Sequence, residues 1–339
     1  MGAESPLVVS LLGLSERLEH RRLQLAILGQ FKRGKSTFIN ALLGASVLPT
    51  GVIPLTAIAT FIAWRPRPLV RIHFKDNKPV EEYSVSDINE IRDLLFRFVA
   101  QEVNPENRLG VARVELFYPA ALLRNGIVLI DTPGVGSTLQ HHTDAALQVL
   151  PECDAALFVL SVDPPITEIE VEYLRRVRSR AARIFFILNK VDYVPQDERA
   201  RVVEFLHKVL SERSLLDRVG SFFCVSARDG LAAREASDSP KLQESGIADL
   251  ESHLVRHLES EKAQWLEASV RTRVIDILSE ATAELALRAR ALSMPVEELA
   301  RRITPFQEAL RSIAEERRIT RDLLSGGSSA HARCSGISH

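Results

Sequence analysis

Apolar runs of strand length alternate with segments of helical periodicity up to about residue 258. The runs are rich in Val, Ile, Leu and Phe. They cover residues 23–29, 57–63, 70–74, 111–118, 127–131, 155–160, 184–189 and 222–226. Helical patterns separate the later runs, which is typical of βαβ units. The pattern therefore predicts an α/β fold with a mostly parallel sheet, helices on both faces, and ligands beyond the carboxyl ends of the strands.

The two ends of the chain have a helical pattern only. Residues 7–20 predict a short amphipathic helix, and after about residue 260 apolar side chains recur at helical spacing as far as Leu292. Met294-Pro295 should end or kink that helix, and residues 296–324 predict a second one. Two helices with polar outer faces indicate a helical hairpin or a partial bundle.

Charge and cysteine content narrow the classes of partner. The chain has 43 Lys and Arg against 44 Asp and Glu, a formal net charge of −1, so no global positive field attracts nucleic acid or an anionic membrane. Its three cysteines are far apart, which argues against a disulfide framework or a zinc site. No apolar stretch approaches the roughly 20 residues of a spanning helix. We expect a cytoplasmic protein, with any membrane contact peripheral and at the inner face, and no nucleic-acid partner.

The first motif lies where a predicted strand turns into a predicted helix. Gly29-Gln-Phe-Lys-Arg-Gly34-Lys35-Ser36 matches the phosphate-loop pattern GxxxxGK[ST] in the context that the pattern requires. The glycines let backbone N–H groups surround a phosphate, Lys35 can reach the β- and γ-phosphates, and Ser36 can ligate magnesium. Thr37, the next residue, is included among the nucleotide-binding residues. The alternative is a chance glycine turn, against which the later motifs argue.

A second motif, Asp131-Thr-Pro-Gly134, follows the predicted strand 127–131. Asp131 can hold the magnesium shell, and the N–H of Gly134 can meet the γ-phosphate. Alone, the motif is equally consistent with an ordinary turn. Its position after a phosphate loop favours the nucleotide role.

Two further motifs lie at the ends of predicted strands and would recognise the base of the nucleotide. In Asn189-Lys190-Val-Asp192, the aspartate can accept hydrogen bonds from guanine N1 and N2, which adenine cannot match, while the stem of Lys190 covers the ring. Ser226-Ala227 supplies a backbone N–H for guanine O6. A polar turn is the alternative for each motif alone. In this order they predict that the chain binds GTP, with Mg²⁺, rather than ATP.

A threonine between the phosphate loop and Asp131 should complete the magnesium shell and help to hold the attacking water. Thr50, Thr56 and Thr60 all compete for this role on the residues alone.

A family resemblance bears on this choice. The segments GQFKRGKSTFINALLG, LPTGVIPLTA, DTPGVGS and LFVLSVDPP resemble those of bacterial dynamin-like proteins, and the resemblance spans residues 7–324. In that family the switch threonine follows a proline-containing loop, which implies Thr56. Asp131 follows Thr56 by 75 residues, as expected for the enlarged GTPase domain of the dynamin family.

Two residues depart from small signalling GTPases. Val135 stands where those enzymes often have a water-orienting glutamine, so the resemblance implies that backbone groups and Thr56 order the nucleophile. Lys32 stands where related large GTPases place a charge-compensating group, and we expect its ammonium to neutralise charge between the β- and γ-phosphates. A solvated loop lysine is the alternative reading.

The resemblance implies an organisation and an activity. Residues 1–19 would form a neck helix, 20–258 the GTPase domain, 259–324 a helical neck or stalk segment, and 325–339 a disordered tail. Hydrolysis of GTP to GDP and phosphate would be coupled to self-association through GTPase domains and to membrane remodelling. A second dynamin-like chain would be a further partner.

Two other functions compete with this one. A ribosome- or RNA-associated GTPase switch usually carries a basic RNA-binding module, whereas the C-terminal helices here are mixed in charge. The other is a GTP-binding scaffold that does not hydrolyse its nucleotide.

Overall fold

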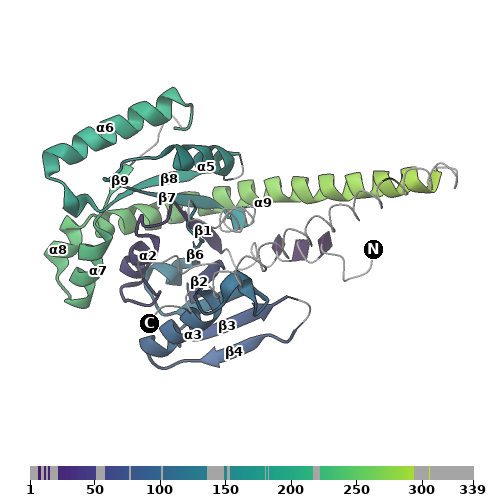
Figure 1. Cartoon of the computed structure of the whole chain (residues 1–339), viewed down its shortest axis with the longest axis horizontal. Helices are drawn as coiled ribbons and strands as arrows, with labels where there is room; N and C mark the ends of the chain where they lie inside the picture. The colour runs from purple at the N-terminus through teal and green to yellow at the C-terminus, as the bar shows by residue number, and fades with distance from the viewer. Residues whose placement is uncertain are drawn as a thin grey trace, which may run out of the picture. The chain divides into compact units, whose positions relative to one another are not determined.

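A computed structural model of the chain describes most of its residues (Figure 1). These are 7–8, 11–12, 14–15, 22–50, 58–75, 78–100, 102–135, 149–150, 153–179, 181, 183–216, 222–293 and 305. The chain divides into two compact units, Met1–Val274 and Ile275–His339, and the site described below lies in the first.

One sheet organises the first unit. Among the described residues it has nine strands, in the order β4-β3-β5-β2-β6-β1-β7-β8-β9. They are β1 (Leu23–Leu28), β2 (Thr60–Trp64), β3 (Leu69–Phe74), β4 (Glu81–Ser84), β5 (Val111–Tyr118), β6 (Ile127–Asp131), β7 (Ala155–Ser161), β8 (Ile184–Asn189) and β9 (Phe222–Cys224). From β6 through β1 to β9 every pairing is parallel. β2 is parallel to β5 but antiparallel to β6, and β3 is antiparallel to β4 and β5. The predicted α/β fold with a mostly parallel sheet is confirmed.

Helices cover both faces of this sheet (Figure 1). They are α2 (Lys35–Leu43), α3 (Ile88–Val99), α5 (Glu168–Arg178), α6 (Gln196–Glu212), α7 (Ala227–Glu235), α8 (Ser239–Glu244) and α9 (Ile247–Ser293). Alternate residues of β1 supply two separate cores, because successive strand side chains point to opposite faces. Leu25 and Ile27 pack with α2, α3 and the start of α9, whereas Ala26 and Leu28 pack with α5 and α6.

Strand β4 is an element that the sequence does not predict. Its four residues are Glu81, Glu82, Tyr83 and Ser84, and it lies at the edge of the sheet with mostly exposed side chains. A short polar edge strand has no apolar alternation, and its polarity discourages pairing with other chains. Strands β3 and β4 pair antiparallel with their neighbours and extend the sheet at this edge. In the sequence they lie between Thr56 and Asp131.

Helix α9 runs from Ile247 to Ser293 and therefore passes residue 258 without a break. Within the first unit Ile247, Leu250 and Leu254 are buried in the core. Described residues between 7 and 15 are helical, as predicted for the N-terminus. The three boundaries between the four predicted segments stay predictions. The second C-terminal helix, apart from residue 305, and the tail at 325–339 fall outside the described residues.

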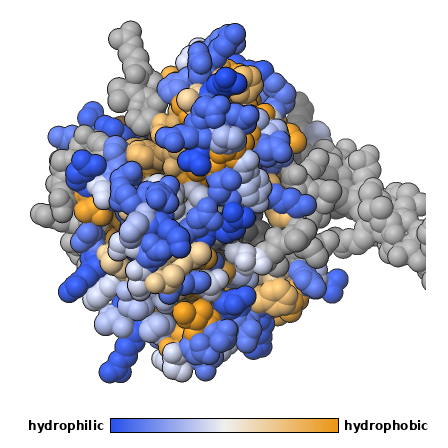
Figure 2. Space-filling view, turned by 90° about the vertical axis from the view of Figure 1, so that its left-hand side faces the viewer, coloured by the Kyte–Doolittle hydropathy of each residue, from blue (hydrophilic) through white to orange (hydrophobic). Residues whose placement is uncertain are grey.

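No helix of the described part is long and apolar enough to span a bilayer. On the face shown in Figure 2, hydrophilic residues predominate and apolar residues form small separate patches.

Candidate nucleotide-binding site

The phosphate loop joins the end of β1 to the start of α2. Two of its positions require glycine, because other atoms lie too close to leave room for a Cβ. Gly29 has φ 144°, and a Cβ there would lie 2.4 Å from the carbonyl oxygen of Val159. Gly34 has φ 86°, and its Cβ would lie 2.6 Å from Nδ2 of Asn189. Both the left-handed backbone and the lack of space exclude larger residues. Ser36 and Thr37 follow in the first turn of α2, half-buried.

Lys35 folds back over this loop. Its Nζ donates hydrogen bonds to the carbonyl oxygens of Gly29 at 3.1 Å and Gln30 at 3.3 Å. Burial lowers the pKa of Lys35 to about 8, although the negative charges of Asp131 and Glu170 act in the opposite direction. The ammonium is therefore held within the loop that should receive phosphate.

Asp131 lies at the carboxyl end of β6, beside Lys35. The residue is 1% exposed, and apart from a weak contact with the Ser36 hydroxyl neither carboxylate oxygen has a hydrogen-bond partner among the described residues. Burial raises its pKa to about 6, against the opposing effects of Lys35 and the Ser36 hydroxyl. A buried oxygen ligand with unused acceptor capacity fits a hard cation such as Mg²⁺.

The residues after Asp131 are fixed against β1 and the phosphate loop. Thr132 Oγ1 donates to the carbonyl of Ile27 at 2.6 Å. The N–H of Phe31 donates to the Val135 carbonyl at 3.0 Å, and a Cβ on Gly134 would come within 2.9 Å of Lys35 Nζ. Val135 is buried, so this position presents an apolar side chain where a water-orienting glutamine would stand in small GTPases.

The predicted base-recognition motifs meet the phosphate loop through Asn189. Its Nδ2 donates to the carbonyl of Arg33 at 2.9 Å, and its Oδ1 accepts from the N–H of Ala227 at 3.1 Å. Ser226 caps α7 by accepting from the N–H of Asp229. The phosphate loop, the Asp131 motif and the Asn189 motif therefore lie at the carboxyl ends of β1, β6 and β8, and Ala227 joins them through Asn189.

Asp192 and Lys190 lie beside an exposed aromatic ring. Nη2 of Arg228 lies 2.8 Å from Oδ2 of Asp192, and the cations of Lys190 and Arg228 are each 5.8 Å from the ring centroid of Tyr193. Burial lowers the pKa of Lys190, and the charges of Arg33 and Lys32 add to this effect. Arg228 is an ion-pair partner for Asp192 that the sequence does not predict.

The candidate switch threonines and Lys32 are the remaining residues singled out from the sequence. Thr56 lies outside the described residues. Thr50 is exposed, whereas Thr60 is buried and stands opposite Asp131 in the β2–β6 pairing. Lys32 is exposed, has a left-handed backbone with φ 69°, and holds its ammonium 5.6 Å from the ring centroid of Phe31.

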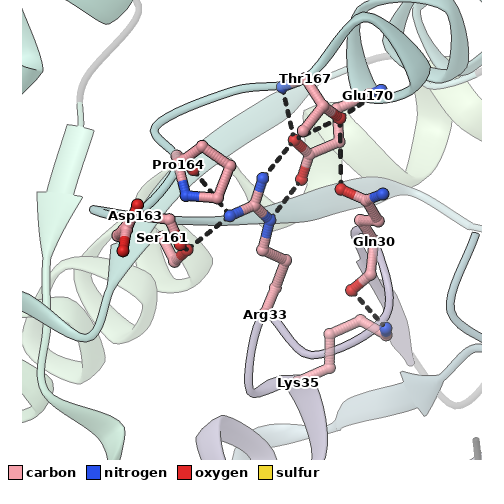
Figure 3. A network of polar contacts seen from close by, with 8 residues as sticks. All are labelled: Gln30, Arg33, Lys35, Ser161, Asp163, Pro164, Thr167 and Glu170. Carbon is pink, nitrogen blue, oxygen red and sulfur yellow. Dashed lines mark hydrogen bonds and ion pairs between the residues drawn. The ribbon is translucent and has the colours of Figure 1, made fainter. Parts of the chain in front are cut away.

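Sequence reasoning misses the buried pair formed by Arg33 and Glu170 (Figure 3). The Thr167-x-x-Glu170 spacing is visible as a capping box and predicts the start of α5. Nothing in that spacing indicates an arginine partner in the phosphate loop.

These motifs at the ends of parallel strands define a P-loop GTPase domain. A family model described as "Dynamin family" matches residues 25–191, which include the phosphate loop and reach Val191. A second model, the elongation factor Tu GTP binding domain, matches residues 111–278 and begins after the phosphate loop.

Two relatives are similar in sequence, and the second is named as a dynamin-like protein. An uncharacterized protein in the xynA 3' region of Caldicellulosiruptor sp. is 33% identical over 308 residues, covering 90% of this chain and 73% of that protein. The bacterial dynamin-like protein of Nostoc punctiforme is 33% identical over 184 residues, covering 53% of this chain and 26% of that protein. The chain belongs to the dynamin family, a family of GTPases.

A solved structure extends the likeness to the whole fold. An oligomerised bacterial dynamin pair, described as sensing and tethering membranes at long range, superposes with a TM-score of 0.58 at 19% identity. The match covers 97% of this chain and 51% of that one, so the chain spans about half the length of this neighbour. The predicted family is confirmed.

Proposed function

We propose that this chain binds GTP with Mg²⁺ and hydrolyses it to GDP and phosphate. The observation that carries the proposal is the position of Asn189, whose amide joins the phosphate loop at Arg33 to the start of α7 at Ala227. A single ligand with a guanine at one end and phosphates at the other suits this arrangement.

The roles of the residues follow from their chemistry. Gly29, Gly34, Thr37 and Lys35 would bind the phosphates, and Gly134 would offer its N–H to the γ-phosphate. Ser36, Thr56 and Asp131 would hold Mg²⁺, which supplies positive charge next to the phosphate oxygens. The base would contact Asn189, Lys190, Asp192, Ser226 and Ala227.

Hydrolysis requires a water oxygen to attack the γ-phosphorus as the bond to the β–γ bridging oxygen breaks. Val135 cannot donate or accept a hydrogen bond through its side chain, so Thr56 and backbone groups would orient the water. The Lys35 ammonium, already close to the loop, would stabilise charge on the departing GDP. Lys32 would add a second positive charge from the exposed side of the loop.

The coupled function extends beyond the nucleotide. We propose self-association through GTPase domains, with a second copy or another dynamin-like chain, on the cytoplasmic side of a membrane that the assembly remodels. Support comes from the family and from the membrane-tethering dynamin pair whose fold this chain shares.

The test is GTP turnover by purified protein over a series of protein concentrations, with and without anionic liposomes. Light scattering with GDP and aluminium fluoride reports pairing. Rising specific activity with concentration, and dimers with the mimic, are the expected results. Constant specific activity and a monomer would contradict pairing, while turnover equal to that of Lys35→Ala would contradict hydrolysis and favour a scaffold. Salt-sensitive retention of RNA would favour the RNA-associated switch.

A further inference from the structure

A buried ion pair connects the phosphate loop to helix α5 (Figure 3). Nε of Arg33 donates to Oε1 of Glu170 at 2.7 Å, and Nη2 donates to Oε2 at 2.6 Å. The two side chains are 4% and 0% exposed. Paired hydrogen bonds between a guanidinium and a carboxylate fix orientation as well as distance, because both groups are planar.

The rest of the guanidinium is also bound. Nη1 donates to Oγ of Ser161 at 2.5 Å and to the carbonyl of Pro164 at 2.7 Å. Ser161 is the last residue of β7, and Pro164 lies in the loop that leads to α5. With four hydrogen bonds to protein groups, this guanidinium is committed to the β7–α5 connection and cannot serve as a charge finger on the phosphates.

Glu170 has a second task at the start of α5. Its Oε2 accepts from the N–H of Thr167 at 2.9 Å, and the Thr167 hydroxyl lies 3.0 Å from the same oxygen. That hydroxyl is also 3.2 Å from Oε1 of Gln30, another phosphate-loop residue. The first turn of α5 is therefore joined to the phosphate loop at two points.

We propose that Arg33 and Glu170 form a positioning pair that fixes the phosphate loop for nucleotide binding. Arg33 precedes Gly34 and Lys35, and its carbonyl accepts the hydrogen bond from Asn189. The residue is thus held at its side chain by α5 and at its backbone by the base-recognition motif. The peptide between Arg33 and Gly34, whose N–H should face a phosphate, is set by these two anchors. This inference rests on the proposed nucleotide site.

The role of the pair in binding is tested by replacing both members. Arg33→Met combined with Glu170→Leu removes both charges together, so that neither is left buried and unpaired. Ser161, Pro164 and Thr167 lose hydrogen-bond partners in this variant, so the melting temperature without nucleotide should fall, and the affinity is measured below that temperature. The Kd for GDP should rise about 10- to 100-fold, because sub-ångström placement of binding groups is lost.

A matched control joins the start of α5 to the end of α6. Glu168 and Arg213 form a paired contact at 2.7 Å and 2.6 Å, but it is exposed and neither side chain is bonded to the phosphate loop in these contacts. Arg213→Met with Glu168→Leu should leave the Kd for GDP unchanged. Arg33→Lys keeps the charge opposite Glu170 but not the paired geometry, and it should weaken GDP binding about 10-fold while folding normally.

The experiment is titration of a fluorescent GDP analogue into the wild type and these variants, with melting temperatures measured in parallel. Wild-type affinity in a folded double variant would overturn the positioning role, as would wild-type affinity in Arg33→Lys if the double variant does not fold. A wild type that binds no guanine nucleotide would instead overturn the proposed function, so the two failures are distinguishable.

Discussion

Asn189, at the carboxyl end of β8, donates a hydrogen bond of 2.9 Å from Nδ2 to the backbone carbonyl oxygen of Arg33 in the phosphate loop. Its Oδ1 accepts from the N–H of Ala227 at 3.1 Å. One buried side chain at the end of β8 therefore links the phosphate loop to the start of α7, segments that are distant in the sequence.

Replacing this side chain should weaken nucleotide binding at both ends of the ligand. In Asn189→Ala the Arg33 carbonyl and the Ala227 N–H lose their partners, and each buried unpaired group costs about 1–3 kcal/mol. We expect GDP affinity to fall about 10- to 100-fold in a fluorescence titration. Asn104→Ala is the control, because Asn104 is equally buried and also joins a carbonyl and an N–H, at Phe98 and Leu109. It should lower the melting temperature without changing affinity.

The buried carboxylate of Asp131 should lower the free energy of unfolding of the nucleotide-free protein, although the same carboxylate is expected to bind the metal. Its pKa of about 6 lies above the unfolded value of about 3.9, so the folded state disfavours the carboxylate and loses stability as pH rises between these values. Asp131→Asn should therefore raise the free energy of unfolding of the nucleotide-free protein by about 2–3 kcal/mol at pH 7. That gain should shrink toward pH 4, while magnesium-dependent GTP turnover is lost.

Denaturant titrations between pH 5 and 7 in a chelator measure this gain. Asp154→Asn provides the contrast, because Asp154 is equally buried but accepts a hydrogen bond from the N–H of Gln24 at 2.7 Å. That variant should be less stable than the wild type. A destabilised Asp131→Asn protein would contradict the argument.

These residues show what the sequence can reveal and what it cannot. The meeting of Asp131 and Asn189 at one site is predictable, because each is the last residue of an apolar, strand-like run. The carboxyl ends of parallel strands lie at one edge of a sheet. β4 is not predictable in this way, since Glu81 and Glu82 leave it without an apolar face. The pairing of Arg33 with Glu170 joins residues 137 positions apart, and each is a charged residue of a type that normally lies on the surface.

Lys32 is the next residue to test, because its role in hydrolysis is an expectation from the resemblance. Its positive φ is tolerated by asparagine, so Lys32→Asn removes the charge without straining the loop. We expect kcat for GTP to fall about 10- to 1000-fold, less than for a rigid arginine finger, with the Kd for GDP nearly unchanged. Lys241→Asn, at an exposed site on α8, is the control. Unchanged turnover in Lys32→Asn would leave Lys32 as an ordinary solvated lysine.

Arg228 is expected to compete with guanine for Asp192. Its guanidinium lies 2.8 Å from Oδ2 of the carboxylate that should accept from the base, and it is 67% exposed, so it can move away at little cost. Exposed ion pairs are worth roughly 0.2–1 kcal/mol, so Arg228→Ala should tighten GDP binding by no more than about 5-fold, mainly through faster association. Stopped-flow measurement of the association rate tests this. Arg175→Ala breaks an ion pair with Glu172 on α5, in which both side chains are exposed, and should have no effect. Weaker binding in Arg228→Ala would mean that the guanidinium contacts the bound nucleotide instead of competing with it.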